Sequence, residues 1–264
     1  MKIFISADIE GVTGVTNWDE TDLDKAVSAG ACEQMTAEVI AACEGALEAG
    51  ASEILIKDAH GSGRNIIASK LPREARLIRS WASHPTMMMQ GLDETFQAAA
   101  FIGYHSRAGA GTNPLAHTMT GAFLRLTIND CDASEFLINT YTASMFKVPV
   151  IFVSGDKGLC EEVAGFNPAI GTVAVKEGVG DSTVNIHPGL ATDRIKESMV
   201  KAMKSDLSKC RVTLPNHFSV GIQYKHHAKA YTCSFYPGAS LKDPLTVHYD
   251  SKDYFDILRF FLFA

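Results

Sequence analysis

The chain opens with Met1-Lys2-Ile3-Phe4-Ile5-Ser6-Ala7-Asp8-Ile9-Glu10, an apolar run that ends in two carboxylates. The same arrangement recurs at Asp58-Ala59-His60 and at Tyr104-His105, each directly after another apolar run. In a parallel sheet such strands end along one edge, where crevices and ligands lie. The sequence therefore predicts that carboxylate and imidazole side chains from three strands meet there as a metal site.

Strand and helix patterns alternate through the first half of the chain. Leu23 to Ala49 has apolar residues at close to a helical period, and strand-like runs at Glu53 to Lys57 and Val148 to Val153 are typical of a buried sheet. Alternating units of this kind predict an α/β fold, a three-layer sheet with helices on both faces. Further expected elements are strands at 98–103, 123–128, 172–176, 218–224 and 243–249, and helices at 134–147, 190–207 and 254–263.

A change of character near residue 165 predicts the domain organisation. Gly165-Phe166-Asn167-Pro168 interrupts the strand and helix pattern, and the elements beyond it form a smaller α+β arrangement. We therefore expect an α/β metal-binding catalytic domain over residues 1–165. A smaller α+β part over residues 166–264 is expected to supply the substrate pocket and oligomer contacts.

Composition excludes several classes of protein. The 264 residues are 46% hydrophobic and 20% charged, which is typical of a globular protein. A net charge of −6 argues against a nucleic-acid partner. No apolar stretch reaches the ~18 residues of a membrane span, and no secretory signal opens the chain. Six cysteines without a C-x-x-C pair predict free thiols in a reducing cytoplasm.

The carboxylates and histidines at the strand ends indicate a metal site only when they are considered together. Asp8 and Glu10 point to the same face if the strand continues, and close carboxylates repel unless a cation neutralises them. Alone, the pair is equally typical of surface charge, and a single histidine such as His60 or His105 is more often structural. Their shared edge favours a divalent metal, because zinc accepts imidazole nitrogen together with carboxylate oxygen. Asp58 could orient one of the imidazoles.

Two further candidates lie downstream. His117 follows a glycine-rich loop and is free to act as a base near neutral pH, although a polar loop residue is the default interpretation. Glu135 lies in the first turn of a helix that Ser134 caps, where the helix dipole favours an acid in any case. His226-His227 and His248 are interpreted as structural or surface residues, because adjacent histidines on a strand point to opposite faces.

Motifs for other chemistries are absent. The chain has no G-x-x-x-x-G-K-[ST] phosphate loop and no G-x-S-x-G nucleophile turn. Five other motifs occur in order between residues 1 and 155: Ser6-Ala7-Asp8-Ile9-Glu10-Gly11, Asp58-Ala59-His60, Gly103-Tyr104-His105, His117-Thr118-Met119 and Ile128-Asn129-Asp130. Together they resemble the bacterial D-aminopeptidase family.

The resemblance implies a cytoplasmic peptidase with two zinc ions per subunit. Asp8 would bridge the two metals, and His117 would be the catalytic histidine. The remaining ligands that the resemblance implies are Glu10, His60, His105 and Glu135. Family members form ring-like homo-oligomers, stacked pentamers among them, whose active sites face a central channel. They remove N-terminal D-amino acids, notably D-alanine, from short peptides.

We therefore predict a zinc-dependent aminopeptidase that acts on short D-residue peptides through metal-activated water. His117 would serve as general base or, less commonly, as nucleophile. The first alternative is a two-metal phosphoesterase, which needs cationic side chains, and only Arg107, Lys57 and Arg64 lie near the motifs. The second alternative is a non-catalytic metal-binding subunit that forms a ring.

Overall fold

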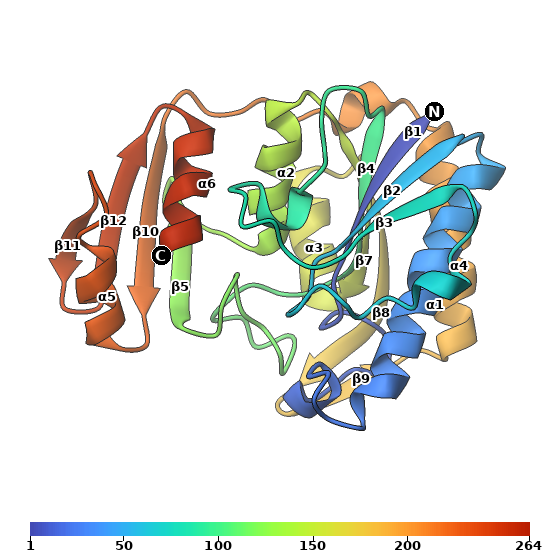
Figure 1. Ribbon diagram of the computed structural model, residues 1–264, viewed down its shortest axis with the longest axis horizontal. Helices are drawn as coiled ribbons and strands as arrows, with labels where there is room; N and C mark the ends of the chain where they lie inside the picture. The colour runs from blue at the N-terminus through green and yellow to red at the C-terminus, as the bar shows by residue number, and fades with distance from the viewer.

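A seven-stranded sheet forms the larger part of the molecule (Figure 1). The computed structural model describes all residues from Met1 to Ala264. In spatial order the strands are β3 (Ala75–Ile78), β2 (Glu53–Asp58), β1 (Lys2–Ala7), β4 (Ala98–Tyr104), β7 (Val150–Asp156), β8 (Gly171–Val179) and β9 (Ser182–Asn185). All neighbours pair in parallel except β8 and β9. The central strands β1, β4 and β7 are almost wholly buried, which explains their continuous apolar runs.

Helices cover both faces of this sheet, as expected for an α/β fold (Figure 1). On one face α1 (Ser28–Glu48) packs against α4 (Pro188–Lys204), and α2 (Glu135–Met145) and α3 (Lys157–Phe166) lie on the other. Single 3-10 turns are η1 (Trp18–Glu20), η2 (Ala68–Lys70), η3 (Met87–Met89) and η4 (Leu207–Cys210). None of the helices combines the length and apolar character needed to cross a membrane.

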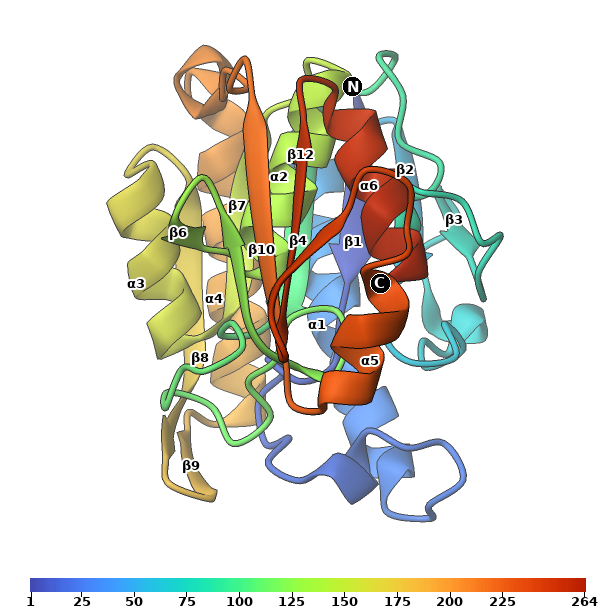
Figure 2. The same cartoon turned by 90° about the vertical axis from the view of Figure 1, so that its left-hand side faces the viewer.

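A second, antiparallel sheet stands beside the first (Figure 2). Its strands in spatial order are β11 (Ser240–Asp243), β12 (Thr246–Ser251), β10 (Phe218–Tyr224), β5 (Phe123–Ile128) and β6 (Cys131–Asp132). Two helices accompany it, α5 (His227–Cys233) and α6 (Tyr254–Phe263). Along β10, every second residue is buried, so only one face of this sheet meets a core.

The sheets do not divide at residue 165, where the sequence pattern changes. β8, β9 and α4 follow that residue and belong to the larger unit, whereas β5 and β6 precede it and belong to the second sheet. The break at Gly165-Phe166-Asn167-Pro168 is the end of α3, a helix that was not predicted. Glycine, asparagine and proline mark a helix end and a domain boundary alike, so local sequence does not distinguish the two.

Two other boundaries differ from the predicted ones. α1 begins at Ser28 rather than near Leu23, because the intervening residues form turns. The strand predicted over 243–249 is instead a hairpin, in which Pro244 and Leu245 form the turn between β11 and β12. Proline has no backbone N–H for a sheet ladder, which is consistent with its place in the turn.

Helix α2 joins the two units. Ser134 caps it, with Oγ accepting a hydrogen bond from the Leu137 N–H at 3.2 Å. Phe136 packs into the core of the large sheet, whereas Leu137 and Ile138 pack into the core of the small one. The helix is therefore covered on both sides, and its first residue, Glu135, lies between the units.

The ends of β1 and β4 approach very closely. The N–H of Asp8 donates to the carbonyl of Ile102 at 2.8 Å, and that of Gly11 donates to the carbonyl of Gly103 at 2.8 Å. Gly103 has a φ of +70°, and a Cβ there would lie 2.3 Å from the carbonyl oxygen of Asp8. Only glycine permits both the left-handed conformation and this contact.

The substitution Gly103→Ala tests this close approach. We expect it to lower the free energy of unfolding by more than Gly14→Ala, measured by chemical denaturation. Gly14 also has a positive φ, +83°, but nothing lies within 4 Å of a Cβ placed there. Gly14→Ala should therefore lower the free energy of unfolding only by the strain of the left-handed conformation, about 1–2 kcal/mol. Gly103→Ala should cost about 1–3 kcal/mol more from the clash, and equal costs would contradict the contact.

Candidate metal centre

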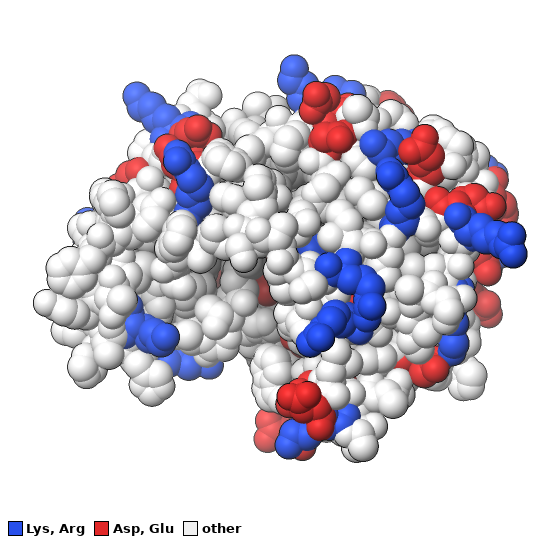
Figure 3. Space-filling model, in the orientation of Figure 1, with Lys and Arg blue, Asp and Glu red and all other residues white.

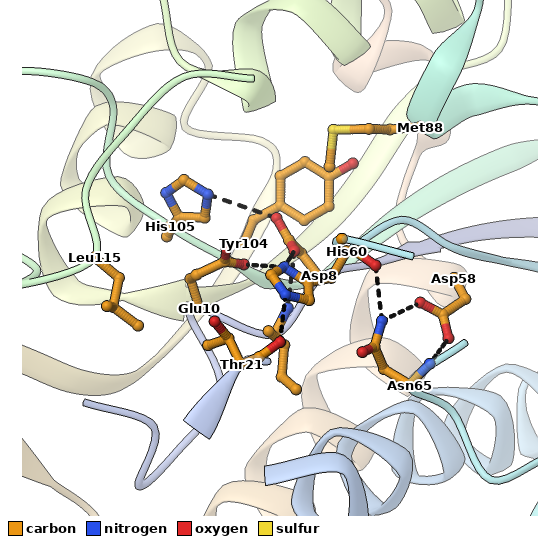
Figure 4. A network of polar contacts seen from close by, with 12 residues as sticks. Asp8, Glu10, Thr21, Asp58, His60, Asn65, Met88, Tyr104, His105 and Leu115 are labelled. Carbon is orange, nitrogen blue, oxygen red and sulfur yellow. Dashed lines mark hydrogen bonds and ion pairs between the residues drawn. The ribbon is translucent and has the colours of Figure 1, made fainter. Parts of the chain in front are cut away.

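Six predicted site residues meet at the carboxyl edge of the large sheet: Asp8, Glu10, His60, His105, His117 and Glu135. Three overlapping groups have ligand atoms within 4.8 Å of one another, namely Asp8-Glu10-His60, Asp8-His105-Glu135 and Glu10-His105-His117. Asp8 belongs to the first two groups and lies between their histidines (Figure 4). The arrangement can therefore hold two cations that share the Asp8 carboxylate.

Backbone carbonyls fix the ring orientation of two of these histidines. Nε2 of His60 lies 2.9 Å from the carbonyl oxygen of Thr21, and Nδ1 of His105 lies 2.9 Å from that of Ser106. A carbonyl oxygen only accepts, so each of these ring nitrogens carries the hydrogen in the neutral imidazole. The other nitrogen of each ring is then left with a lone pair, as a metal ligand requires.

Those free nitrogens face buried carboxylates. Nδ1 of His60 lies 2.9 Å from Glu10 Oε2 and 3.4 Å from Asp8 Oδ1. Nε2 of His105 lies 3.6 Å from Asp8 Oδ2 and 3.5 Å from Glu135 Oε2. Glu10 Oε2 and His105 Nε2 are buried without a hydrogen-bond partner. Because unsatisfied buried polar atoms are costly, these atoms fit a cation placed between them.

The pKa shifts within the cluster also favour a bound cation. Burial and the neighbouring Glu10 carboxylate raise the pKa of Asp8 well above its usual range. Burial lowers the pKa of His60, but the carboxylates of Glu10 and Asp8 outweigh it and raise that pKa to about 12. For His105, the Glu135 carboxylate likewise outweighs burial and raises the pKa to about 10. The cluster therefore attracts positive charge strongly.

His117 faces this cluster from the glycine-rich loop. Its Nδ1 lies 2.9 Å from the carbonyl oxygen of Leu115, and its Nε2 lies 3.7 Å from Glu135 Oε1. The ring stacks on that of His105, with centroids 4.3 Å apart and 15° between planes, and it meets the Trp18 ring edge-on at 5.4 Å. The imidazole is held on both sides, and Nε2 presents its lone pair to the centre of the site.

A cavity of about 650 Å³ opens over the cluster. Figure 3 shows the corresponding hollow between the two units, with red acidic atoms visible inside it. Its apolar walls come from Trp18, Trp81, Met87, Met88, Met119 and Leu262. No lysine or arginine lines it, and Leu262 is its only residue from 166–264. The pocket that was predicted for the C-terminal part is thus built almost entirely from residues before 136.

A buried amide and a buried carboxylate, neither of them predicted from the sequence, hold the site together. Oδ2 of Asp156 accepts hydrogen bonds from the Ser106 N–H at 2.7 Å and from Asn113 Nδ2 at 2.9 Å. Asn113 Nδ2 also donates to the carbonyl of Glu10 at 3.0 Å, and its Oδ1 accepts from the Leu115 N–H at 2.9 Å. The pair therefore ties together the segments that carry Glu10, His105 and His117.

The missed residues have recognisable signals. Asp156 is the last residue of the buried strand β7, an arrangement like that of Asp58 in β2 and of Asp8 directly after β1. It was not predicted because the predicted strand ended at Val153. It also caps α3, with its side chain accepting from the Leu159 N–H. Lys176 is a buried lysine on β8 that donates to the carbonyls of Glu10 and its loop. Its strand was predicted, but no sequence pattern marks the side chain.

Asp58 differs from its predicted role of orienting an imidazole. Its carboxylate accepts hydrogen bonds from the Asn65 N–H at 2.6 Å and from Asn65 Nδ2 at 2.9 Å. Asn65 Nδ2 in turn donates to the carbonyl of His60 at 2.8 Å (Figure 4). Asp58 therefore positions the backbone at His60, because the carbonyl of Thr21 already holds the imidazole N–H.

The remaining histidines lie outside the cluster. His226 and His227 lie at the start of helix α5 and are exposed. They are therefore surface residues, but they do not lie on a strand as predicted. His248 lies on β12, with Nε2 2.8 Å from Ser219 Oγ and Nδ1 3.1 Å from Asp250 Oδ2. The Ser219 N–H already donates to Asn129, and none of these residues belongs to a metal-binding group.

Buried carboxylates and imidazoles at the base of a cleft are the donor set of a metallohydrolase. Within that class, the chain belongs to the D-aminopeptidase family, peptidase family M55, whose model matches residues 1–263. The D-aminopeptidase of Bacillus subtilis (strain 168) is 31% identical over 255 residues, which cover 96% of this chain and 92% of that protein.

A solved structure agrees with this assignment. It is described as "Zn-dependent D-aminopeptidase DppA from Bacillus subtilis, a self-compartmentalizing protease". Its TM-score with this chain is 0.92 at 29% identity, and the match covers 99% of this chain and 96% of that one. The predicted α/β fold, the family resemblance and the enzyme class, a D-aminopeptidase, are confirmed.

The Asn113 bridge gives a test with a matched control. We expect Asn113→Ala to lower kcat on a D-alanyl peptide by about 10–100-fold, because the bond to Glu10 and the Leu115 turn are lost. Asn167→Ala removes the same kinds of bond, to the Lys209 carbonyl at 3.0 Å and from the Ala169 N–H at 3.0 Å, away from the site. Equal kcat values for the two variants would exclude a positioning role for Asn113.

Proposed function

We propose that this protein binds two zinc ions and removes N-terminal D-amino acids, such as D-alanine, from short peptides. The observation that carries the proposal is the orientation of the imidazoles. His60 and His105 each give one ring nitrogen to a backbone carbonyl and turn the other toward buried carboxylates. Asp8 would hold both ions, with Glu10 and His60 on one side and His105 and Glu135 on the other.

Zinc fits this donor set. It accepts imidazole nitrogen and carboxylate oxygen in one site, whereas calcium and magnesium prefer oxygen alone. The solved relative is described as Zn-dependent, which supports the same choice of metal here. When bound, zinc supplies a Lewis acid for the scissile carbonyl and lowers the pKa of water to about 7.

His117 is the proposed general base. Its Nδ1 donates to the Leu115 carbonyl, so Nε2 is free to accept a proton from water and to deliver it to the leaving amine. Glu135 and Glu10 lie 3.7 and 4.0 Å from Nε2, so the ring nitrogen lies beside the proposed metal ligands.

The cavity argues against a phosphoesterase. Such an enzyme needs cationic side chains for the phosphate, and no lysine or arginine lines this cavity. Lys57 is buried and bonds to backbone carbonyls, and Arg107 forms an ion pair with Asp132 at 2.8 Å. A peptide needs no such cations. The orientation of His117 toward the cluster likewise supports a catalytic rather than a purely metal-binding protein.

Assembly and location follow as further proposals. We infer a homo-oligomer, because the solved relative is described as a self-compartmentalizing protease, and we propose a ring of stacked pentamers from the family resemblance. Large apolar side chains of the smaller unit, Tyr231, Phe235 and Phe263, are 59–69% exposed and would be covered in a subunit interface. A cytoplasmic location is supported by six free cysteines, five of them buried.

Stereospecific hydrolysis tests the proposed function directly. With purified protein and added zinc, D-Ala-D-Ala should be cleaved at least ~100-fold faster than L-Ala-L-Ala, measured as released alanine. This preference follows the family to which the chain belongs. Faster cleavage of the L-dipeptide would contradict the D-specificity. Cleavage of neither, with zinc bound, would contradict the peptidase proposal.

His117→Gln tests the proposed base. The variant should bind both zinc ions but lose about 10²–10⁴-fold in kcat, because glutamine cannot accept the proton. His187→Gln is the matched control, since His187 only caps helix α4. The measurements are zinc content by mass spectrometry and kcat on D-Ala-D-Ala. A His117→Gln rate close to that of the control would assign the proton transfer to another group.

A further inference from the structure

Lys57 is a buried lysine that the proposed chemistry does not use. It lies on β2, and its Nζ donates to the carbonyls of Asp58 at 2.6 Å and Ser80 at 2.8 Å. The third contact of Nζ is the ring of Trp81, whose centroid is 3.8 Å away. Burial lowers the pKa of Lys57 to about 8, so placing an ammonium group there costs free energy. Two of its three contacts, those with Ser80 and Trp81, are with the segment that follows the neighbouring strand β3.

The segment that Lys57 contacts forms a wall of the active-site cavity. Trp81 lines that cavity and is 37% exposed there. Its Nε1 donates to the carbonyl of Gly61 at 2.7 Å, directly after the proposed ligand His60. Ser80 has a φ of +62°, and its N–H donates to the carbonyl of Gly63 at 2.7 Å. The indole is therefore fixed by a cation on its face and a hydrogen bond at its edge.

The apolar wall formed by Trp81 borders a cavity with room for a bulky part of a ligand. The cavity of about 650 Å³ is larger than an alanine side chain requires, and it is lined by the side chains of the polar cluster as well as by apolar ones. Met87 and Leu262 add to the apolar lining. Exposed apolar surface beside convergent polar groups is typical of a binding site for an apolar ligand part.

We propose that Trp81 is the wall of a subsite for a large apolar side chain on one of the two residues joined by the scissile bond, and that Lys57 positions it. The proposal rests on the proposed peptidase function and deepens it. The preferred substrates would be short D-peptides with an aromatic or branched aliphatic residue at that position. Lys57 acts through Trp81 and does not touch the substrate.

The test compares two pairs of peptides that differ by one side chain. D-Phe-Gly-Gly is compared with D-Ala-Gly-Gly, and D-Ala-Phe-Gly with D-Ala-Ala-Gly. In one pair the wild-type enzyme should favour the phenylalanine peptide by about 10–200-fold in kcat/KM, as a filled apolar pocket allows. Trp81→Ala should abolish that preference through KM, so that the phenylalanine and alanine peptides of that pair give similar kcat/KM values.

Lysine variants separate positioning from general stability. Lys57→Met keeps the length of the side chain without its charge and should reduce the preference for phenylalanine. Lys2→Met is the matched control, because Lys2 lies 4.0 Å over the ring of Phe96, outside the cavity. Because Lys57 is fully buried, the decisive variants are those at the part-exposed Trp81, including Trp81→Phe, which retains an aromatic ring and should retain most of the preference.

Each outcome bears on one of the two proposals. An unchanged phenylalanine preference in Trp81→Ala would overturn the subsite, and a Lys57→Met result equal to that of Lys2→Met would overturn the role of Lys57. Binding of D-Phe-Gly-Gly and D-Ala-Phe-Gly to the His117→Gln protein, measured by calorimetry, needs no turnover. Binding that depends on Trp81 without any hydrolysis by wild type would keep the subsite and contradict the peptidase function.

Discussion

Repulsion among buried carboxylates is the constraint on which the rest of this structure depends. Asp8, Glu10 and Glu135 are almost completely buried within one cluster, and desolvation makes their charges costly unless cations accompany them. His60 and His105 turn their free ring nitrogens toward these carboxylates, which completes a donor set that fits metal ions. The proposed zinc ions thus have a structural as well as a chemical reason to be there.

The fold brings these charges together from distant parts of the chain. Parallel strands deliver Asp8, His60 and His105 to one edge, and helix α2, packed between two cores, delivers Glu135 from the other side. Glycine at 103 lets the strand ends touch, and Asn113 fixes the glycine-rich loop to the Glu10 backbone. Catalysis requires this rigidity, because a small displacement of a catalytic base or a metal ligand lowers the reaction rate.

The sequence predicted the parts of this site that local pattern encodes. Strand ends and their polar residues are visible as apolar runs followed by Asp8, His60 and His105. Glu135 could be assigned only by family resemblance, because an acid in the first turn of a helix is common. The change of pattern at residue 165 does not coincide with the division between the two sheets, and Asp156, Lys176 and the Lys57–Trp81 contact were missed. These depend on packing between segments far apart in sequence, which no local period reveals.

The most direct test of the central claim is calorimetric titration of zinc into metal-free protein. The account predicts two zinc ions per subunit for the wild type and the loss of both in Asp8→Asn, whose carboxylate is shared between the two groups. Asp253→Asn, at a carboxylate that caps α6 away from the cluster, should still bind two. An Asp8→Asn protein that retains two zinc ions, or a wild type that binds none, would contradict the account.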